Sequence, residues 1–205
     1  MTPRVYRLGR RQAAVDRTRA RILKAARAAL TARGSAEFSI DAVARRARVT
    51  RATVYQRFGS RAKLLEALFG DLAQEGGMWD LREAFARPDP GQALSLFVAT
   101  FARFWTVHRP IHRRLLALAA LDPVLERTLR ARQEWRRPGL RTITARAHER
   151  YGTAPPDTQA ETVELLFTLT SFQTFDTLAG PDRTPEQVAP LILKVARQVL
   201  GMTPR

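Results

Sequence analysis

The sequence contains no cysteine among its 205 residues, so disulfide bonds and cysteine-based metal sites are excluded. Long hydrophobic runs are also missing. The longest apolar stretch covers residues 115–121, far short of the ~20 residues that a membrane-spanning helix needs. No basic segment followed by an apolar one opens the chain, so we expect no secretory signal, no membrane association and a cytoplasmic location.

Acidic residues are scarce in one part of the chain. Residues 1–69 hold 17 Lys and Arg against 4 Asp and Glu, whereas residues 70–205 hold 18 against 15. Only 3 of the 35 basic residues are lysines, which codon bias toward arginine can explain. Codon bias does not, however, remove acids from one third of a chain only. The asymmetry therefore favours a polyanion-binding module joined to a nearly neutral remainder.

Clean alternation of polar and apolar residues, the pattern of a half-buried strand, does not occur. Apolar residues recur at helical spacing nearly throughout, with Gly and Pro between the segments, which predicts an all-α fold. In the basic third, four helices are expected. The first carries Ile22, Ala25, Ala26, Ala29 and Leu30 and ends at Gly34; the next three are capped by Ser39, Thr50 and Ser60; and the fourth ends near Gly76 and Gly77.

Longer helices are expected in the remainder. An apolar stripe covers 94–105, a further helix covers 110–121, and another runs from Asp122 toward Gly152 with Pro138 kinking or splitting it. A single helix is expected over 163–178. Thr184 begins a capping box for the last helix, although Pro190 argues for a later start.

The segment RRARVTRATVYQRFGSRAKLL, residues 45–65, holds seven basic residues and no acidic one. Two short helices joined by three or four residues describe a helix-turn-helix. The helix capped by Thr50 begins with Arg51, and the one capped by Ser60 begins with Arg61 and Lys63. Positive charge in the first turn opposes the helix dipole, but it suits a phosphate bound at each N-terminus.

Hydroxyl, amide and guanidinium groups on the third helix are donors of the kind that reach phosphates and base edges in a major groove. The alternative is an ordinary solvated face. Charge alone does not separate the two interpretations, whereas charge, capping and spacing together favour DNA.

Residues 18–65, TRARILKAARAALTARGSAEFSIDAVARRARVTRATVYQRFGSRAKLL, resemble the DNA-binding domain of the tetracycline-repressor (TetR) family. The resemblance rests on the pattern T-x-Y-x-x-F-x-S-[KR]-x-x-L-L after a capped second helix. The segment LTSFQTFDTLAG, followed by a capped final helix, is also similar to members of this family. The resemblance implies a homodimer with a four-helix interface between C-terminal helices, and an effector held in the core.

The resemblance also assigns roles by position. It implies phosphate contacts for Ser39, Thr53 and Tyr55, base contacts for Arg51 and Ala52, and a base or backbone contact for Gln56. Arg57 and Arg61 stand where His and Lys are common. Arg48 occupies a turn position usually filled by glycine. The complete set expected at DNA is Ser39, Arg48, Thr50, Arg51, Ala52, Thr53, Tyr55, Gln56, Arg57, Arg61 and Lys63.

We therefore divide the chain into a basic N-terminal arm (1–16), a helix-turn-helix DNA-binding domain (17–62) and an effector-binding and dimerisation domain (63–205). The arm either enters the minor groove or is disordered. The expected function is a ligand-responsive repressor that a small apolar or aromatic effector releases from a palindromic operator. Candidate pocket residues are Phe101, Phe104, Trp105, His108, Trp135, Phe167 and Phe172, each of which has ordinary core packing as its alternative.

Two other functions remain open at this stage. An enzyme is disfavoured because the sequence shows no glycine-rich phosphate loop, and because no carboxylate completes a metal site with His108 and His112. We expect no cofactor and no metal. An architectural DNA-binding protein without a ligand is the third possibility.

Overall fold

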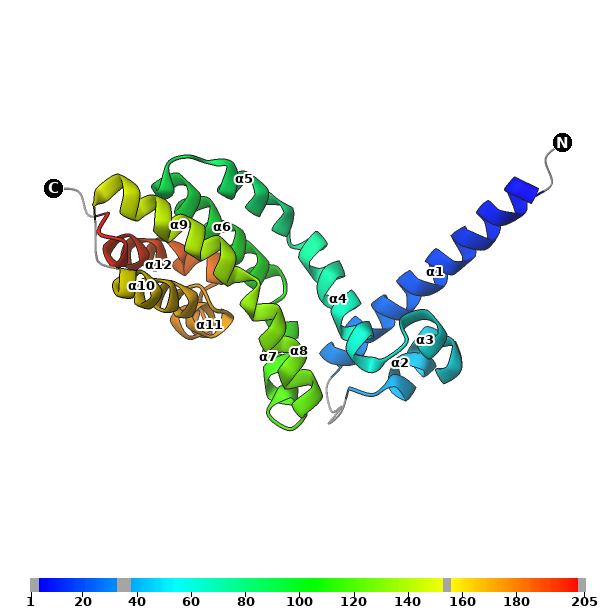
Figure 1. Ribbon diagram of the computed structural model, residues 1–205. Coiled ribbons are helices and arrows are strands. Elements are labelled where there is room, and N and C mark those ends of the chain that lie inside the picture. Colours follow the sequence, from blue (N-terminus) through cyan, green and yellow to red (C-terminus); the bar gives the residue numbers. More distant parts are fainter. Residues whose placement is uncertain (1–3, 33–37, 153–155, 203–205) are drawn as a thin grey trace. The chain divides into compact units, whose positions relative to one another are not determined.

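The computed structural model describes residues 4–32, 38–152 and 156–202. These residues form α-helices and one short 3-10 helix, with no strand among them, which confirms the expected all-α class (Figure 1). Contacts divide the chain into two compact units. Unit 1 comprises Met1–Asp71 and Arg113–Thr128, and unit 2 comprises Leu72–His112 and Leu129–Arg205.

Unit 1 is built on a three-helix head. Its elements are α1 (Arg4–Thr31), α2 (Ile40–Ala47), α3 (Arg51–Phe58), the first part of α4 (Arg61–Glu75), the end of α7 (Arg109–Ala119) and the start of α8 (Pro123–Glu134). Helix α1 is longer than expected, since the backbone is helical from Arg4 and residues 4–16 continue the helix. The expected helix end at Gly34 lies outside the described residues.

The core of unit 1 follows the predicted apolar positions. Fully or nearly buried side chains come from the faces predicted for the four N-terminal helices: Ile22, Ala26, Leu30, Val43, Ala47, Val54, Phe58, Leu64, Leu65 and Leu68. Because small and β-branched residues line the inner face of α2, this helix approaches α1 closely, and α3 packs against α2. The charged side chains of both short helices stay outside the core.

Unit 2 surrounds the central helix α6 (Pro90–Val107). The other elements are the 3-10 helix (Met78–Asp80), α5 (Leu81–Ala86), α9 (Arg136–Tyr151), α10 (Pro156–Leu169), α11 (Phe172–Ala179) and α12 (Pro185–Val199). Helix α6 packs against α5, α9 and α12, while α10 packs against α9 and α12. Ten residues of α6 are buried, so the helix forms the centre of this unit rather than its surface.

Three helix boundaries in the C-terminal half bear on the site. The break between α8 and α9 falls at Trp135, which places Pro138 in the first turn of α9, where the missing N–H costs little. The single helix expected over 163–178 is wrong. Helix α10 ends at Leu169 and α11 begins at Phe172, because Ser171 Oγ caps the new helix by accepting from the Thr174 N–H at 3.2 Å.

The later start expected for the last helix is also wrong. Helix α12 begins at Pro185, where the Thr184 capping box is complete, and it continues through Pro190. A proline at this position removes the hydrogen bond to the carbonyl of Glu186 and crowds that carbonyl with its ring. The reciprocal cap and the buried stripe of α12 outweigh that loss.

Candidate nucleic-acid interface and effector site

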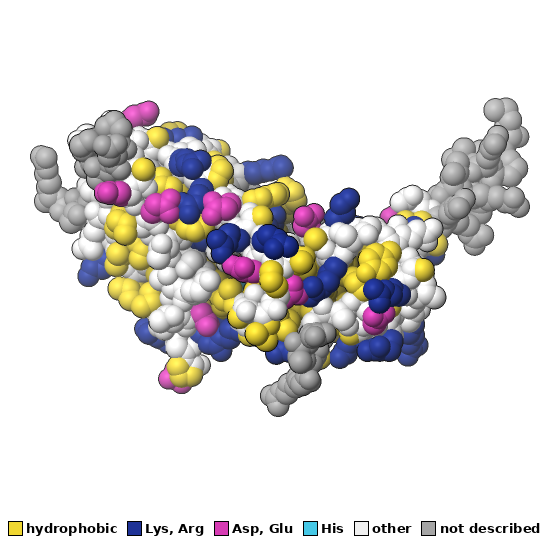
Figure 2. Space-filling model, turned by 60° about the horizontal axis from the view of Figure 1, so that its bottom comes forward, with side chains coloured by type: hydrophobic (Ala, Val, Ile, Leu, Met, Phe, Trp, Pro, Cys, Tyr) yellow, Lys and Arg dark blue, Asp and Glu magenta, His cyan; other side chains and the backbone are white. Residues whose placement is uncertain are grey.

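One face of α3 is exposed. Arg51, Ala52, Tyr55 and Gln56 are exposed, whereas Val54 and Phe58 are buried against the head. Positions i, i+1, i+4 and i+5 lie on one side of a helix, so the side chains expected at base edges and at the backbone share a surface. Lys and Arg side chains lie along the edge of unit 1, to which α3 belongs, in the space-filling view (Figure 2).

Side-chain caps fix the N-termini of the helices around this face. Ser39 Oγ accepts from the Ala42 N–H at 3.2 Å, Thr50 Oγ1 from the Thr53 N–H at 3.1 Å, and Ser60 Oγ from the Lys63 N–H at 3.1 Å. These caps confirm the three predicted helix starts. In the first turns of α3 and α4 no residue is acidic, which leaves these ends suited to an anion.

The turn between α2 and α3 depends on Arg48. Its φ of 52° lies in the left-handed region, as expected for a residue standing where glycine is usual. The Arg48 N–H donates to the carbonyl of Arg45, and the Val49 N–H donates to the carbonyl of Ala44. These bonds satisfy the last carbonyls of α2, which offsets a conformational cost of roughly 1 kcal/mol.

Arg51 is held in place on the surface of the head. It donates to Asp41 at 2.9 Å and to the Tyr55 hydroxyl at 3.4 Å. Tyr55 and Asp41 together raise the pKa of Arg51. The guanidinium is thus fully charged and oriented by its neighbours, although both side chains of the Arg51–Asp41 pair remain about half exposed. Asp41 has no part in the sequence-based assignment of the site.

Arg61 lies at the first position of α4 and is already paired. Its Nη2 donates to Asp122 at 2.5 Å, and its guanidinium lies 5.6 Å from the Phe38 ring. Asp122 Oδ1 also caps α8 by accepting from the N–H groups of Val124 and Leu125. The hydrogen bond from Arg61 is the main reason why the pKa of Asp122 is lowered.

A hollow of about 540 Å³ lies beside these residues within unit 1. It is lined by Ser39, Asp41, Arg51, Tyr55 and Arg61 together with the α7–α8 turn. Four residues that the sequence assigned to DNA binding therefore border one concavity. Sequence analysis missed the acids Asp41 and Asp122, because an isolated carboxylate has no spacing that points to its partner.

Aromatic rings fill the interior of unit 2. Phe97, Phe101, Trp105 and Phe172 follow one another at centroid separations of 4.8, 5.7 and 5.6 Å. Phe104 joins this cluster at 4.8 Å from Trp105. The structure thus brings together Phe101, Phe104, Trp105, His108 and Phe172 from the predicted pocket. Trp135 is 73% exposed and lies against Arg132 on the surface.

The two histidines of the cluster are hydrogen-bonded to backbone carbonyls within the packed interior. His108 is fully buried, and its Nε2–H donates to the carbonyl of Leu72, in the last turn of α4, at 2.9 Å. His112 Nδ1 donates to the carbonyl of His108 at 3.1 Å. Burial lowers the pKa of His112 to about 4, so the ring is neutral at pH 7. Among the described residues no group of three potential metal ligands occurs.

One buried cation belongs to the same interior. Arg136, the first residue of α9, is only 4% exposed, and its guanidinium lies 4.2 Å from the Phe167 ring and 5.8 Å from the Phe101 ring. Sequence analysis missed this residue, because an arginine next to a second arginine in an arginine-rich chain carries no signal of burial.

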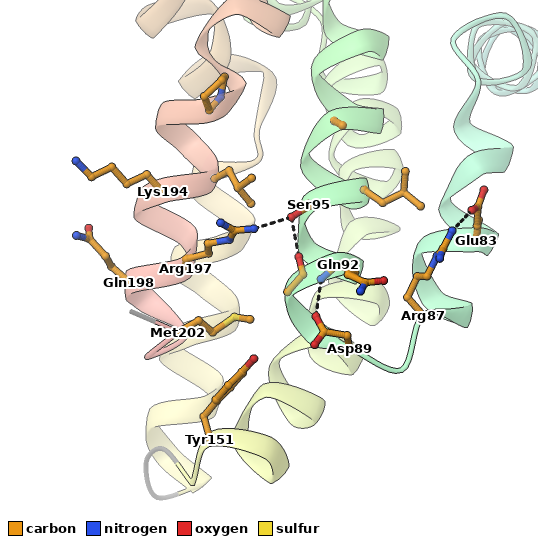
Figure 3. Close-up of a pocket in the computed structure, with 15 residues that line it drawn as sticks. Glu83, Arg87, Asp89, Gln92, Ser95, Tyr151, Lys194, Arg197, Gln198 and Met202 are labelled. Carbon is orange, nitrogen blue, oxygen red and sulfur yellow. Dashed lines mark hydrogen bonds and ion pairs between the residues drawn. The ribbon is translucent and has the colours of Figure 1, made fainter. Parts of the chain in front are cut away.

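A separate, open groove of about 1060 Å³ runs between α6 and α12 (Figure 3). Arg197 Nη2 donates to Ser95 Oγ at 3.1 Å across it, and Arg87 pairs with Glu83 at one side. Leu96, Leu193 and Met202 add apolar surface. None of the residues proposed from sequence for the effector lies in this groove.

Similarity to known proteins agrees with this architecture. Residues 22–68 match the profile described as bacterial regulatory proteins, tetR family. No curated protein matches the chain. In the part of the chain that the structure describes, no helix is both long and apolar enough for a membrane span.

Two solved structures share the fold. A transcriptional regulator from Rhodococcus sp. Rha1 has 19% sequence identity and a TM-score of 0.60, over 90% of this chain and 94% of its own. RolR, solved in complex with its ligand resorcinol, has 21% identity and a TM-score of 0.52, over 95% of this chain and 96% of its own. Proteins of this family are DNA-binding regulators rather than enzymes. Over its helix-turn-helix the chain is therefore similar to the tetR family of bacterial regulatory proteins, and it shares its fold with these two regulators.

Proposed function

We propose that the protein is a cytoplasmic repressor that binds a palindromic operator as a homodimer and leaves it when a small apolar or aromatic effector binds. The exposed face of α3, flanked by capped N-termini without acids, is the observation that carries this proposal. Such a face matches the recognition helix of a helix-turn-helix, which lies in the major groove.

The side chains divide the work of DNA binding. Arg51 and Ala52 reach base edges, and Gln56 reaches either a base or the backbone. The other predicted residues contact phosphates or fix the turn: Ser39, Arg48, Thr50, Thr53, Tyr55, Arg57, Arg61 and Lys63. Phosphate contacts supply affinity irrespective of sequence, whereas contacts at base edges supply the choice of operator.

Dimer formation is supported by an apolar surface on unit 2. Leu165 of α10 is 54% exposed and Leu191 of α12 is 46% exposed, on two helices that pack against each other. Pairing of these helices with their copies removes both leucines from water, and it produces the four-helix interface that the family resemblance implies. A two-fold axis in turn requires an operator with two-fold symmetry.

Release depends on the link between the aromatic cluster and α4. The last turn of α4 is held by His108 through the carbonyl of Leu72, and Phe104 packs against Gly76 directly after it. The proposed effector site consists of five buried members of the predicted set, Phe101, Phe104, Trp105, His108 and Phe172, together with the half-buried Phe167. An effector lodged there displaces these rings and with them the end of α4. Because half-sites lie about 34 Å apart, a shift of a few ångströms prevents both heads from binding together.

Selection of duplexes from random DNA by the full chain tests the DNA half of the proposal. A short inverted repeat is expected. Addition of small aromatic compounds to the selected complex tests the other half, with loss of the retarded band as the expected result. An architectural protein instead selects no defined sequence. If an inverted repeat is selected but no compound releases it, the effector part of the proposal is wrong.

A further inference from the structure

The interior of unit 2 contains a guanidinium that uses two of its five N–H donors. Arg136 Nη1 donates to the carbonyl of Phe167 at 2.9 Å and to Thr170 Oγ1 at 3.0 Å. Its Nε and Nη2 are buried and have no acceptor. Buried donors in native proteins are almost always paired, so two unpaired ones on a single side chain need a physical explanation.

The two unpaired nitrogens are adjacent on the guanidinium. Nε and Nη2 donate in parallel along one edge, while Nη1 donates from the other end of the plane. That edge matches the two oxygens of a carboxylate in a bidentate pair. The protein's own acceptors occupy the Nη1 end, and they leave free the edge that suits a carboxylate.

The neighbouring arginine shows how the chain neutralises a cation when the role is structural. Arg137 pairs with both Glu134 and Glu164. Its guanidinium lies 3.9 Å from the ring of Phe167, which also contacts Arg136. Arg136 forms no ion pair with any described carboxylate, although it is more buried than Arg137. Burial lowers the pKa of Arg136 to about 10, and the group therefore still carries its charge at neutral pH.

A purely structural role accounts for only part of this arrangement. The Nη1 contacts satisfy acceptors at the break between α10 and α11, where the Trp105 Nε1–H also donates to the carbonyl of Thr170 at 3.3 Å. One nitrogen is enough for that purpose. The guanidinium that carries the remaining edge lies near the rings of Phe101 and Phe167, beside the aromatic cluster, and packing alone gives no reason to bury the unpaired donors of Nε and Nη2 there.

We infer that Arg136 anchors the effector, and that the effector is a small aromatic carboxylate. Its two carboxylate oxygens accept from Arg136 Nε and Nη2, and its ring lies against the rings of the cluster. The inference rests on the proposed function for its biological meaning, but binding itself can be measured without DNA. Since the rings of the cluster are closely packed, the ligand displaces at least one of them, which links binding to the movement proposed for release.

Calorimetry on the full chain tests this inference. The probes are benzoate, 4-hydroxybenzoate, phenylacetate and 2-naphthoate, with the neutral analogue benzamide and the phenol resorcinol for comparison. The variants are Arg136→Lys, which keeps the charge but loses the edge, and Arg136→Gln. Arg197→Lys is the matched control, because Arg197 is an exposed arginine of the open groove. Circular dichroism establishes that each variant is folded.

At least one carboxylate is expected to bind the wild type at least tenfold more tightly than benzamide. Arg136→Lys weakens that carboxylate at least tenfold, while Arg197→Lys leaves it unchanged. The inference is overturned if no carboxylate binds the wild type, if benzamide binds equally well, or if the Arg136 variants bind as the wild type does. If a variant does not fold, the comparison of benzoate with benzamide on the wild type decides alone.

Release of operator DNA by resorcinol in both wild type and Arg136→Lys contradicts the inference but supports the proposed function. A chain that binds carboxylate through Arg136 yet selects no operator contradicts the proposed function instead.

Discussion

Arg61 donates to Asp122 at 2.5 Å, so the first residue of α4 is tied to the turn between α7 and α8 within unit 1. The same arginine stands at a helix N-terminus where a phosphate is expected. A carboxylate and a phosphate therefore compete for one guanidinium. Because this pair is partly exposed, the free energy at stake is about 0–1 kcal/mol.

Asp122→Asn should strengthen DNA binding. The substitution removes the competing charge, while asparagine still caps α8. We expect up to about fivefold tighter binding to specific and random duplexes alike, measured by fluorescence anisotropy. Glu66→Gln is the control, because Glu66 is an exposed acid on α4, the helix that begins with Arg61. An equal gain in both variants would show that net charge, rather than release of Arg61, is responsible.

Arg51→Ala should change which operators are preferred, whereas Tyr55→Phe and Arg61→Ala should weaken binding to all sequences alike. Loss of a good contact to a base costs about 1–3 kcal/mol of discrimination at that position, while loss of a phosphate contact carries no sequence information. Binding to a panel of operator variants separates the two effects. The same loss for all three proteins across the panel argues against this division of roles.

Gly76→Ala should destabilise the protein. A Cβ at this position would lie 2.4 Å from Phe104 Cδ2, and this ring is fixed in the aromatic cluster. We expect a loss of about 1–3 kcal/mol in the free energy of unfolding. Gly70→Ala is the matched control on α4, because a Cβ there meets nothing within 4 Å. Gly70→Ala should gain about 0.5–1 kcal/mol, since alanine is the better helix former. Chemical denaturation of both variants gives the comparison.

Acid should destabilise the aromatic cluster through His112. Its pKa is lowered from 6.5 to about 4 by burial, so between these values the unfolded chain binds a proton that the folded chain does not. The contribution of neutral His112 to the free energy of unfolding is complete above pH 6.5. It is lost as the pH falls toward 4, and the loss is about 3 kcal/mol at most. His108 faces His112 and lies 6.4 Å away between ring centroids. Denaturation curves for wild type and His112→Gln across this range should diverge at neutral pH and converge in acid. Parallel pH profiles would exclude His112 as the source.

Short-range sequence patterns predict the helices of the three-helix head. Ser39, Thr50 and Ser60 each cap a helix through a residue three positions ahead, so short-range spacing alone identifies them. The buried positions of α2 and α3 follow helical periodicity in the same way. The left-handed φ of Arg48 agrees with the family resemblance, which puts this residue at a turn position usually filled by glycine.

Long-range relationships were not predictable in this way. Arg61 and Asp122 are 61 positions apart, and Arg136 meets Phe167 31 positions away. Such contacts depend on how helices pack, which periodicity does not specify. The break at Thr170 and Ser171 has a similar origin. Ser171 has a capping side chain, but a serine inside an apolar helical pattern does not by itself end the helix. Here the break is stabilised by tertiary hydrogen bonds, because Trp105 and Arg136 donate to acceptors of Thr170.

Hydroxyl-radical footprinting of the full chain on its selected duplex tests the central claim most directly. A pair of three-helix heads that place α3 in consecutive major grooves should protect two symmetric half-sites, with centres about 34 Å apart. The protections should disappear together as salt is raised, because about ten phosphate contacts are lost as a set. A single protected half-site, or uniform weak protection along the whole duplex, would contradict the account.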